Sequence, residues 1–384
     1  MVAEHASDAL VEMPKPPRTR ALSVLVHPWA TNDYQPLLYE AVLQADPSVR
    51  LHRSNWQPLD LALLLPRMLY YRLTGTSVFH LHWPIFTPRP HRSALRTIAL
   101  YYCLSIIWLI KLLRFRLIWT MHNRLPHEAQ TADDVRVART ILAKSDAVIV
   151  HSPATAADIA SQLKPTTLLF TAAQGPYPTV LASHTPSEIR EDHAIPPDAV
   201  LFLFCGWIRE YKGIPELLHA FRELADKAQV HLIIAGECDN PELHHTILDA
   251  ARSISCLTYL PGYLPDPKLS SYLRAADYVC LPFRRLTTSS SAMLALSHLR
   301  PIIAPMLGDL VDLPPACGYF YDPVISDGLP KALVAAANAG PPQDCRTGAI
   351  ASFIRASSWA QLAEVTLSAY RRSSGSEGKK RPVV

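Results

Sequence analysis

The stretch LFLFCGWIREYKGIPELLHAF, Leu201–Phe221, predicts a buried strand, a turn and an amphipathic helix in that order. The run Val200–Cys205 is entirely apolar and has the length of a buried strand. Gly206 follows it and lets the chain turn with little side-chain hindrance. Beyond Gly213 the apolar residues recur at the 3.6-residue spacing of a helix. The turn therefore places its side chains at a helix N-terminus.

Two cations, Arg209 and Lys212, stand in this turn. A helix N-terminus favours negative charge, and a guanidinium and an ammonium add full charges and donors that can hold a diphosphate. Short glycine and lysine motifs also recur by chance, so a strand-to-helix turn with two solvated cations is the alternative. The turn is a candidate phosphate site.

The composition is typical of a soluble globular enzyme, and 384 residues are enough for about two domains. The seven cysteines are odd in number, contain no C-x-x-C motif and in several cases lie in apolar runs. They are Cys103, Cys205, Cys238, Cys256, Cys280, Cys317 and Cys345. We expect buried free thiols in a reducing compartment. We also expect disordered tails at residues 1–19, which lack a signal peptide's apolar stretch, and at the polar, basic residues 372–384.

Strand-like runs alternate with helical patterns in both halves of the chain, which is typical of parallel α/β domains. The first half offers strands at Ala21–His27, Val78–Trp83, Leu117–His122 and Ala147–His151, and helices such as Tyr34–Gln44 and Asp133–Lys144. The second half offers strands at Val200–Cys205, His231–Ala235, Leu257–Tyr259, Tyr278–Pro282 and Pro301–Ala304.

The Pro-, Ser- and Thr-rich segment Thr171–Pro197 has no clear periodicity and divides the two halves. We place the interdomain linker there and the ligand cleft between the domains. The expected division is one Rossmann-like domain at residues 20–175 and a second at 176–345. A helical segment at 346–371, which includes the helical stretch Ser357–Arg371, follows them.

The stretch Leu61–His127 contains nine Arg or Lys residues and no Asp or Glu, within a chain of net charge +4. Inside it, Ile98–Ile110 is an uncharged apolar run that is too short to span a bilayer. One interpretation is a helix that dips into the inner leaflet of the membrane while the basic segment 89–116 lies on anionic headgroups. The other is a buried helix with basic ends. We expect no nucleic-acid partner, because helix-turn-helix, zinc-ligand and RNP-type patterns are absent.

With these motifs, the chain resembles glycosyltransferases of the GT-B type, in which two Rossmann-like domains face each other across a cleft. Gly206-x-x-Arg209-x-x-Lys212-Gly213 resembles the diphosphate motif of the large nucleotide-sugar family, and Leu257–Phe283 and Leu299–Gly308 resemble the segments that follow it. The resemblance covers most of Ala21–Arg371 as a pattern. It implies a nucleotide sugar as donor and co-substrate, no cofactor, no metal and a C-terminal helix that crosses back to the first domain. It also implies that the domain at residues 20–175 binds the acceptor and the domain at residues 176–345 binds the nucleotide sugar.

One departure from that family concerns the mechanism. The large retaining family carries two glutamates eight residues apart, and alignment on Pro301 places those positions at Leu286 and Leu294. The segment Leu286–Ala295, LTTSSSAMLA, instead carries a hydroxyl cluster at a helix start. Taken alone the cluster is an ordinary Ser/Thr cap, although such a helix start can also bind phosphate or sugar hydroxyls.

The hydroxyl cluster, together with His80-Leu81-His82-Trp83-Pro84 and the segment Trp119–Glu128, WTMHNRLPHE, resembles bacterial exopolysaccharide β-mannosyltransferases. Ser290 stands where those enzymes often have glycine. The resemblance implies transfer of mannose from GDP-mannose, with inversion, to a polyprenyl-diphosphate-linked glycan.

Inverting transfer needs a base that takes a proton from the acceptor hydroxyl. His122 ends a predicted strand, where open α/β sheets place their ligands, and is one candidate; its alternatives are a structural role or a contact without proton transfer. The catalytic candidates are His122, Glu128 and Asp33. The donor-binding candidates are Gly206, Trp207, Arg209, Lys212, Gly213, Tyr263, Thr288, Ser289, Ser290 and Ser291. The acceptor-binding candidates are Asn32, Tyr34, Trp83 and Asn123.

His80 and His82 alternate on a predicted strand and therefore share a face, as two ligands of a metal ion would. No third ligand has usable spacing, so we expect no metal site.

We therefore predict a nucleotide-sugar-dependent hexosyltransferase in polysaccharide or glycolipid synthesis, cytoplasmic and peripherally associated with the cytoplasmic membrane. Its acceptor would be a lipid-linked glycan. A glycosyltransferase that uses a UDP-sugar is one alternative. A nucleotide-binding scaffold that has lost transfer chemistry is the other, and the missing glutamates are the observation in its favour.

Overall fold

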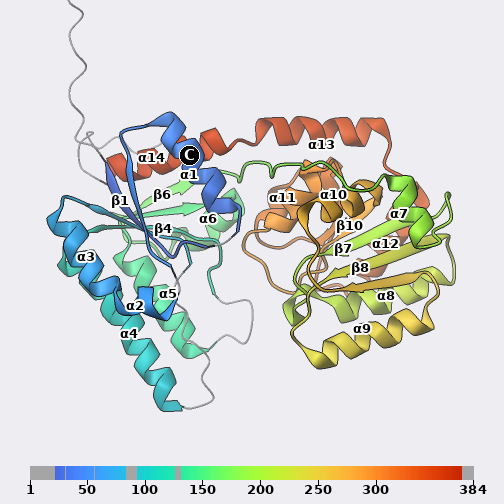
Figure 1. The fold of residues 1–384 in the computed structure, drawn as a ribbon, viewed down its shortest axis with the longest axis horizontal. Coiled ribbons are helices and arrows are strands. Elements are labelled where there is room, and N and C mark those ends of the chain that lie inside the picture. The colour runs from blue at the N-terminus through green and yellow to red at the C-terminus, as the bar shows by residue number, and fades with distance from the viewer. Residues whose placement is uncertain (1–21, 31, 56, 84–92, 126–130, 374–384) are drawn as a thin grey trace, which may run out of the picture.

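The computed structural model describes residues 22–30, 32–55, 57–83, 93–125 and 131–373. Figure 1 shows two α/β units, each built on one sheet. Both sheets have six strands, and every pair of neighbouring strands is parallel. Parallel strands need crossover connections, so helices separate them along the chain. This confirms the expected α/β architecture of two Rossmann-like domains.

The N-terminal sheet has the strand order β2-β1-β3-β4-β5-β6. Its strands are β1 (Ser23–His27), β2 (Arg50–Arg53), β3 (Val78–Leu81), β4 (Arg116–Thr120), β5 (Ala147–Val150) and β6 (Leu168–Thr171). Its helices are α1 (Tyr34–Ala45), α2 (Pro58–Ala62), α3 (Leu64–Leu73), α4 (Ser93–Leu112), α5 (Ala132–Lys144) and α6 (Pro153–Ala160). The strand order reverses between β1 and β3. Ligands of open α/β sheets bind outside the carboxyl ends of the strands at such a reversal.

The C-terminal sheet has the strand order β12-β11-β10-β7-β8-β9. Its strands are β7 (Val200–Cys205), β8 (Val230–Gly236), β9 (Leu257–Pro261), β10 (Tyr278–Cys280), β11 (Ile302–Pro305) and β12 (Gly318–Tyr321). Its helices are α7 (Pro186–Asp192), α8 (Ile214–Ala225), α9 (Pro241–Ser253), α10 (Asp266–Ala275), α11 (Ser290–Ser297), α12 (Gly328–Ala339) and the short 3-10 helices η1 (Glu210–Lys212), η2 (Gly308–Asp312) and η3 (Pro315–Cys317). Here the reversal lies between β7 and β10, as in dinucleotide-binding folds.

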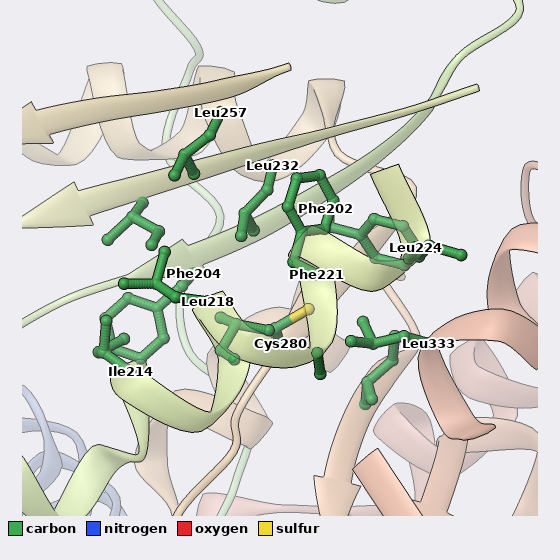
Figure 2. Close-up of a cluster of buried hydrophobic side chains, with 14 of the residues drawn as sticks. Phe202, Phe204, Ile214, Leu218, Phe221, Leu224, Leu232, Leu257, Cys280 and Leu333 are labelled. Atoms are coloured by element: carbon green, nitrogen blue, oxygen red, sulfur yellow. The ribbon is translucent and has the colours of Figure 1, made fainter. Parts of the chain in front are cut away.

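Strand β7 is buried on both faces, which explains why its sequence is apolar without alternation. Phe202 and Phe204 point to one side of the sheet, where they pack with Phe221 of α8 and with residues of α9 and α12 (Figure 2). Leu201 and Leu203 point to the other side, against α7, α10 and α11. The central strand therefore fixes both helical layers of the domain.

The last helix, α14 (Trp359–Arg372), lies against the N-terminal sheet, although the chain reaches it from the C-terminal domain (Figure 1). Leu362, Leu367 and Tyr370 are buried there among residues of β1 and α1. The crossing back that the resemblance implied is thus present. Each buried leucine contributes roughly 1.5–3 kcal/mol of transfer free energy to this packing.

The linker and the second crossing lie side by side where they pass between the domains. The Trp359 indole N–H donates to the Pro176 carbonyl oxygen at 2.6 Å. A Cβ at Gly175 would lie 2.4 Å from the Trp359 ring, so the two segments approach too closely for a larger residue. Two chain crossings, packed together, therefore join the domains.

Several elements were missed by the sequence patterns, and all have little apolar periodicity. Strands β2, β6 and β12 lie at sheet edges, where strands are short and need fewer apolar residues. Helix α7, within Thr171–Pro197, buries only Ile189, although Thr185 and Glu188 form a capping box at its start. Helix α13 (Asp344–Ala356) lies largely within the helical segment expected at 346–371, but it buries only Ile350, which packs on the C-terminal domain.

Some predictions lie outside the described residues. They concern the tail at 1–19, residues 374–384 of the C-terminal tail, Glu128, and residues 89–92 of the basic segment. The C-terminal tail was expected to begin at Arg372, but that residue ends α14.

Helix α4 has one buried face and one exposed face. Leu104 and Ile107 are buried in the core of the N-terminal domain, whereas Ile98, Trp108 and Leu112 are exposed. The apolar run is therefore a core helix that also presents apolar side chains outward. Among the described residues, no helix has the length and hydropathy needed to span a bilayer.

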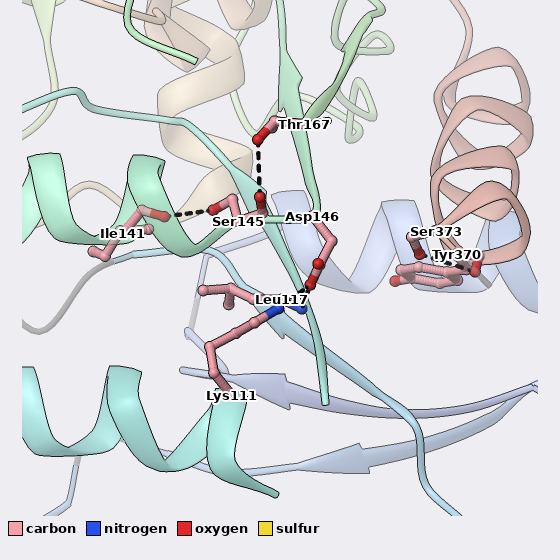
Figure 3. Close-up of polar contacts among 8 residues, drawn as sticks. All are labelled: Lys111, Leu117, Ile141, Ser145, Asp146, Thr167, Tyr370 and Ser373. Carbon is pink, nitrogen blue, oxygen red and sulfur yellow. Dashed lines mark hydrogen bonds and ion pairs between the residues drawn. The ribbon is translucent and has the colours of Figure 1, made fainter. Parts of the chain in front are cut away.

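Asp146 fixes the basic end of α4 to the sheet (Figure 3). Its Oδ2 accepts from the Lys111 ammonium at 2.6 Å and from the Leu117 backbone N–H at 2.8 Å. Asp60 forms a similar ion pair with Arg67 of α3. Among the described residues of Leu61–His127, Arg67 and Lys111 are thus paired with carboxylates that lie outside that stretch of sequence.

Leu367→Ala tests the return of α14 to the N-terminal domain. Removal of a fully buried leucine leaves a cavity, so we expect the free energy of unfolding to fall by roughly 2–5 kcal/mol. Urea denaturation followed by circular dichroism measures this change. Glu364→Ala, on the exposed face of the same helix, is the matched control and should stay within about 0.5 kcal/mol of the wild type. Equal effects of the two substitutions would contradict the packing of α14 described above.

Candidate functional site

A cavity of about 200 Å³ lies between the domains, at the carboxyl ends of strands that flank both reversals. From the N-terminal domain it is lined by Asn32, Trp83, His122 and Asn123, which follow β1, β3 and β4. From the C-terminal domain it is lined by Tyr211, Lys212, Phe283, Leu286, Thr288, Ser289, Ser290 and Ser291, which follow β7 and β10. The structure thus brings together predicted residues of all three groups: catalytic, donor-binding and acceptor-binding.

A second cavity of about 570 Å³ adjoins the first and shares Asn32, Ser290 and Ser291 with it. Asp33 lines it from the N-terminal domain, and Tyr263 lines it from the loop after β9. The Tyr263 side chain is 71% exposed, so its ring is available to a ligand. The larger cavity has the size of a small-molecule site, and the two cavities together suit an elongated ligand.

Glycines shape the turn after β7. Gly213 has a φ of +70°, and a Cβ there would lie 1.9 Å from the Pro282 carbonyl oxygen, so only glycine fits. Gly206 has a φ of +107°, and its own carbonyl oxygen would lie 1.9 Å from a Cβ at Gly236. The backbone of the turn therefore packs directly against the neighbouring loops. Neither Gly206 nor Gly213 lines either of the two cavities.

The two cations of this turn have different surroundings. Lys212 lines the small cavity and is 8% exposed, and its ammonium makes no hydrogen bond or ion pair with a described residue. Burial lowers the pKa of its ammonium to about 8, with a smaller contribution from Arg209 in the same direction. Arg209 instead pairs with Asp239 at 3.1 Å and lies 4.9 Å from the centroid of the Trp207 ring. Neither Arg209 nor Trp207 lines the cavities.

The hydroxyl cluster forms the start of α11. Ser289 is the N-cap, and its Oγ accepts from the Ala292 N–H at 3.1 Å, which is the cap expected of such a cluster. The Ser290 hydroxyl donates to the Gln174 Oε1 at 3.3 Å. The Thr288 hydroxyl is buried and has no hydrogen-bond partner among the described residues. Capping and cavity lining therefore coexist: Ser289 does both, and the other members of the cluster line the cavity without capping the helix.

Asp309 was not predicted, although it follows strand β11 at the same edge of the sheet. Its carboxylate accepts from the Ser289 N–H at 3.0 Å and so lies at the start of α11. Burial raises the pKa of this carboxyl to about 7, against the opposing effect of the Ser289 N–H. The signal available in the sequence was an acidic residue in the loop after a predicted strand, directly behind a glycine.

His122 is held among aromatic rings. The Trp83 ring stacks on it at 4.4 Å between centroids, and the Tyr34 ring meets it edge-on at 4.4 Å. Its Nε2 lies 3.0 Å from the Nδ1 of His82, and its Nδ1 has no partner among the described residues. Burial and the neighbouring histidines hold the pKa of His122 well below its usual value. The imidazole is therefore neutral at physiological pH.

Other predicted residues lie at different depths. Asp33 precedes α1, its carboxylate does not cap that helix, and the side chain is exposed. Tyr34 is buried, and its hydroxyl is 3.1 Å from the His151 Nε2, so it supports the site from behind and does not line either cavity. His80 and His82 are buried and bonded to tyrosines. Among the described residues, no cluster of three His, Cys, Asp or Glu side chains is placed to hold a metal ion.

Residues 199–339 match the model of the family described as glycosyl transferases group 1. This part of the chain is therefore similar to a group 1 glycosyltransferase domain. The chain is also 27% identical over 237 residues to the GDP-mannose:glycolipid 4-beta-D-mannosyltransferase of Xanthomonas campestris pv. campestris. That alignment covers 61% of this chain and 62% of the relative, so the chain spans less than two thirds of the relative's length.

A second relative is the D-inositol 3-phosphate glycosyltransferase of Pseudarthrobacter chlorophenolicus, 31% identical over 139 residues, which are 34% of this chain and 33% of that protein. Among solved structures, the sucrose-phosphate synthase of Thermosynechococcus elongatus matches with a TM-score of 0.70 and 17% identity, over 93% of this chain and all of that one. The residues that match the group 1 family therefore lie within a chain that has the GT-B fold.

Lys212→Met tests whether the buried ammonium serves a ligand. In the folded protein the pKa of Lys212 is about 8, and in the unfolded chain it has the ordinary value of 10.5, so the unfolded state binds more protons between these values. The buried charge therefore costs stability below pH 8, and this cost shrinks as the pH rises toward 10.5. We expect the free energy of unfolding of the methionine variant to exceed that of the wild type by roughly 1–3 kcal/mol at pH 7, and by less at pH 9.

The same variant should bind a nucleoside diphosphate at least ~10-fold more weakly, because a charge-assisted contact is lost. Urea denaturation at both pH values and calorimetric titration with GDP measure the two effects. Lys227→Met, which changes an exposed lysine of the same domain, is the control. A less stable Lys212→Met protein with unchanged GDP affinity would show that this lysine is structural.

Proposed function

We propose that the chain is an inverting hexosyltransferase that moves mannose from GDP-mannose to a lipid-linked glycan. The observation that carries this proposal is the 200 Å³ cavity, in which Lys212, the start of α11 and His122 meet from two domains. A group 1 glycosyltransferase domain and a mannosyltransferase relative at 27% identity support the reaction class and the sugar.

The donor would lie across both cavities. Its diphosphate fits the small cavity, where the Lys212 ammonium and the N-terminal end of α11 offer positive charge. The nucleoside fits the larger cavity, where the exposed Tyr263 ring can stack on a base. As the bond from the anomeric carbon to the diphosphate breaks, negative charge grows on the leaving oxygen, and these fixed groups stabilise it.

The acceptor would enter from the N-terminal domain, where Asn32 and Trp83 line the cavity. Its hydroxyl oxygen forms a bond to the anomeric carbon on the face opposite the diphosphate, and its proton passes to a base. The candidates for that base remain His122, Asp33 and Glu128, the last of which lies outside the described residues. The glutamate positions of the retaining family are Leu286 in the small cavity and Leu294 in the larger one. A site without these carboxylates favours inversion.

Asp33→Asn is expected to lower the turnover number by ~100-fold or more and to leave GDP affinity within ~2-fold, because an amide cannot accept the proton of the acceptor hydroxyl. The assay follows GDP release from GDP-mannose in the presence of a polyprenyl-diphosphate-linked oligosaccharide. Stability shifts with GDP, UDP and ADP, measured in parallel, identify the nucleotide. A larger shift with UDP would replace mannose transfer by transfer from a UDP-sugar, and near-normal turnover of the variant would remove Asp33 as the base.

We further propose that α3 and α4 hold the protein on the anionic inner leaflet of the cytoplasmic membrane, where such an acceptor is anchored. The end of α3 is joined to the residue after α4 by a bond from the Arg72 Nε to the Leu113 carbonyl oxygen at 2.7 Å. Both expose apolar side chains: Leu65, Leu69, Tyr70 and Leu73 on α3, and Ile98, Tyr101, Trp108 and Leu112 on α4. Arg114 follows α4 and is exposed. Apolar area beside cations is the pattern of a membrane-surface helix.

The double variant Ile98→Ser with Leu112→Ser should weaken binding to vesicles that contain phosphatidylglycerol by ~10-fold or more, because two apolar side chains no longer enter the leaflet. Arg114→Glu should weaken it by a smaller factor that declines with added salt. Vesicle co-sedimentation measures both. Val324→Ser is the control, since Val324 is 88% exposed but belongs to the C-terminal domain. Unchanged co-sedimentation of the double variant would reject this surface.

A further inference from the structure

Behind His122 lies a chain of buried hydrogen bonds that the proposed transfer does not itself require. The His82 Nδ1 is 3.0 Å from the His122 Nε2, and the His82 Nε2 is 2.7 Å from the Tyr39 hydroxyl. The Tyr39 hydroxyl is also 2.8 Å from the His80 Nδ1, and the His80 Nε2 is 2.8 Å from the Thr120 Oγ1. All five side chains are buried. The chain runs from the interior of the N-terminal domain to the cavity.

Each of the three imidazole rings in this hydrogen-bonded chain carries one N–H proton at neutral pH. Burial lowers the pKa of His80 to about 3 and holds the pKa values of His82 and His122 well below their usual value. A neutral imidazole has one N–H donor and one lone pair, so a donor on one side forces an acceptor on the other. The tautomers of the three histidines are therefore linked.

The direction of the chain follows from its inner end. The only hydrogen-bond partner of the Thr120 hydroxyl among the described residues is the His80 Nε2. A buried donor without an acceptor costs more than an unused lone pair, so Thr120 donates and the His80 Nε2 accepts. The proton of His80 is then on Nδ1, where the hydroxyl oxygens of Tyr39 and Tyr370 lie at 2.8 Å and 2.7 Å to accept it.

The positions of the protons on His82 and His122, at the end of the chain nearest the cavity, then follow. The Tyr39 hydroxyl is also bonded to the Tyr370 hydroxyl. Tyr370 is the donor in that bond, because the His80 Nδ1 beside it is already protonated and cannot accept. Tyr39 therefore donates its own proton to the lone pair of the His82 Nε2. The proton of His82 is therefore on Nδ1 and is donated to the His122 Nε2. This leaves the proton of His122 on Nδ1, the ring nitrogen that makes no bond to a described residue, in a side chain that lines the cavity.

We infer that His82 is a positioning residue that holds His122 as a neutral N–H donor, directed at an oxygen of the bound nucleotide sugar, and not as the base of the reaction. This inference rests on the proposed function for the identity of the ligand. The donor set of the cavity then consists of the His122 N–H, the Lys212 ammonium and the start of α11. All three favour oxygen that carries negative charge. The proton of the acceptor hydroxyl would pass to Asp33 or Glu128.

The first test reads the tautomer without any activity. In protein with ¹⁵N-labelled histidine, long-range proton–nitrogen correlation spectra distinguish a protonated ring nitrogen from one with a lone pair, and loss of one signal set in His122→Phe assigns His122. We expect a protonated Nδ1 in the wild type. In His82→Leu we expect a mixture of both tautomers, while His231→Leu, at a buried histidine that bonds Thr258 in the C-terminal domain, leaves the pattern unchanged. A protonated Nε2 in the wild type overturns the inference.

The second test separates a donor from a base by substitution. An asparagine at position 122 can place an amide N–H near the position of the imidazole Nδ1, whereas no amide accepts a proton in the transition state. We expect His122→Asn to keep turnover within ~10-fold of the wild type and His122→Phe, which retains the stacking on Trp83 but has no nitrogen, to lose ~100-fold or more. Equal loss in both variants overturns the donor role.

The two tests distinguish failure of the inference from failure of the proposed function. If GDP-mannose is not a substrate but the wild-type spectrum shows a protonated Nδ1 that His82→Leu disturbs, the hydrogen-bond assignment stands and the proposed transfer fails. If mannose is transferred and the spectrum shows a protonated Nε2, the transfer stands and the assignment fails. His82→Asn, which retains an amide donor toward the His122 Nε2, replaces His82→Leu if the leucine variant does not fold.

Discussion

Parallel pairing in both sheets is the constraint on which the site depends. In a parallel sheet all strands end at the same edge, so the loops after β1, β3 and β4 meet at one edge and those after β7 and β10 at another. Each order reversal leaves room outside these ends because the crossovers on its two sides run in opposite directions. The cavity between the domains is lined from both edges, and no single element could supply its donors alone.

The relative placement of the two edges depends on the double crossing of the chain. Helix α14 is anchored in the N-terminal core, and Trp359 at its start bonds the linker at Pro176. Direct bonds also cross the gap near the cavity: the Ala154 N–H donates to Asp312 at 2.9 Å, and the Arg124 N–H to the Thr287 hydroxyl at 3.3 Å. Polar contacts of this kind, together with two covalent crossings, are compatible with a pair of domains that can open and close on a ligand.

The sequence predicted elements best where burial is two-sided. Val200–Cys205 was predicted at its observed bounds because an apolar run of that length without alternation is typical of a strand covered on both faces. The edge strand Arg50–Arg53 was missed because it has two exposed arginines and no apolar face. The same reasoning applies to the site. Lys212 and the Ser290 region, which line the candidate cavity, could be singled out because they follow strands, and the position of a loop at a strand end is a local property.

Contacts between distant segments could not be read from the sequence. The bond between His82 and His122 exists because β3 pairs with β4, with Leu81 opposite Trp119, and a single sequence contains no record of that register. His80 and His82 were considered as metal ligands because they share a strand face. Their tyrosine partners come from α1 and α14, near opposite ends of the chain. Asp309 at the start of α11 was missed for the same reason.

Two buried groups, Lys212 in the small cavity and Asp309 at the start of α11, have charged forms that burial disfavours. Burial lowers the pKa of Lys212 to about 8 and raises that of Asp309 to about 7, so both pKa values lie near neutral pH. An anion in the cavity changes this balance: it favours the charged form of Lys212 and the protonated, neutral form of Asp309. Both effects increase the positive potential at the start of α11. The diphosphate proposed to bind there would offset the cost of the buried Lys212 charge, and part of its affinity would come from that offset.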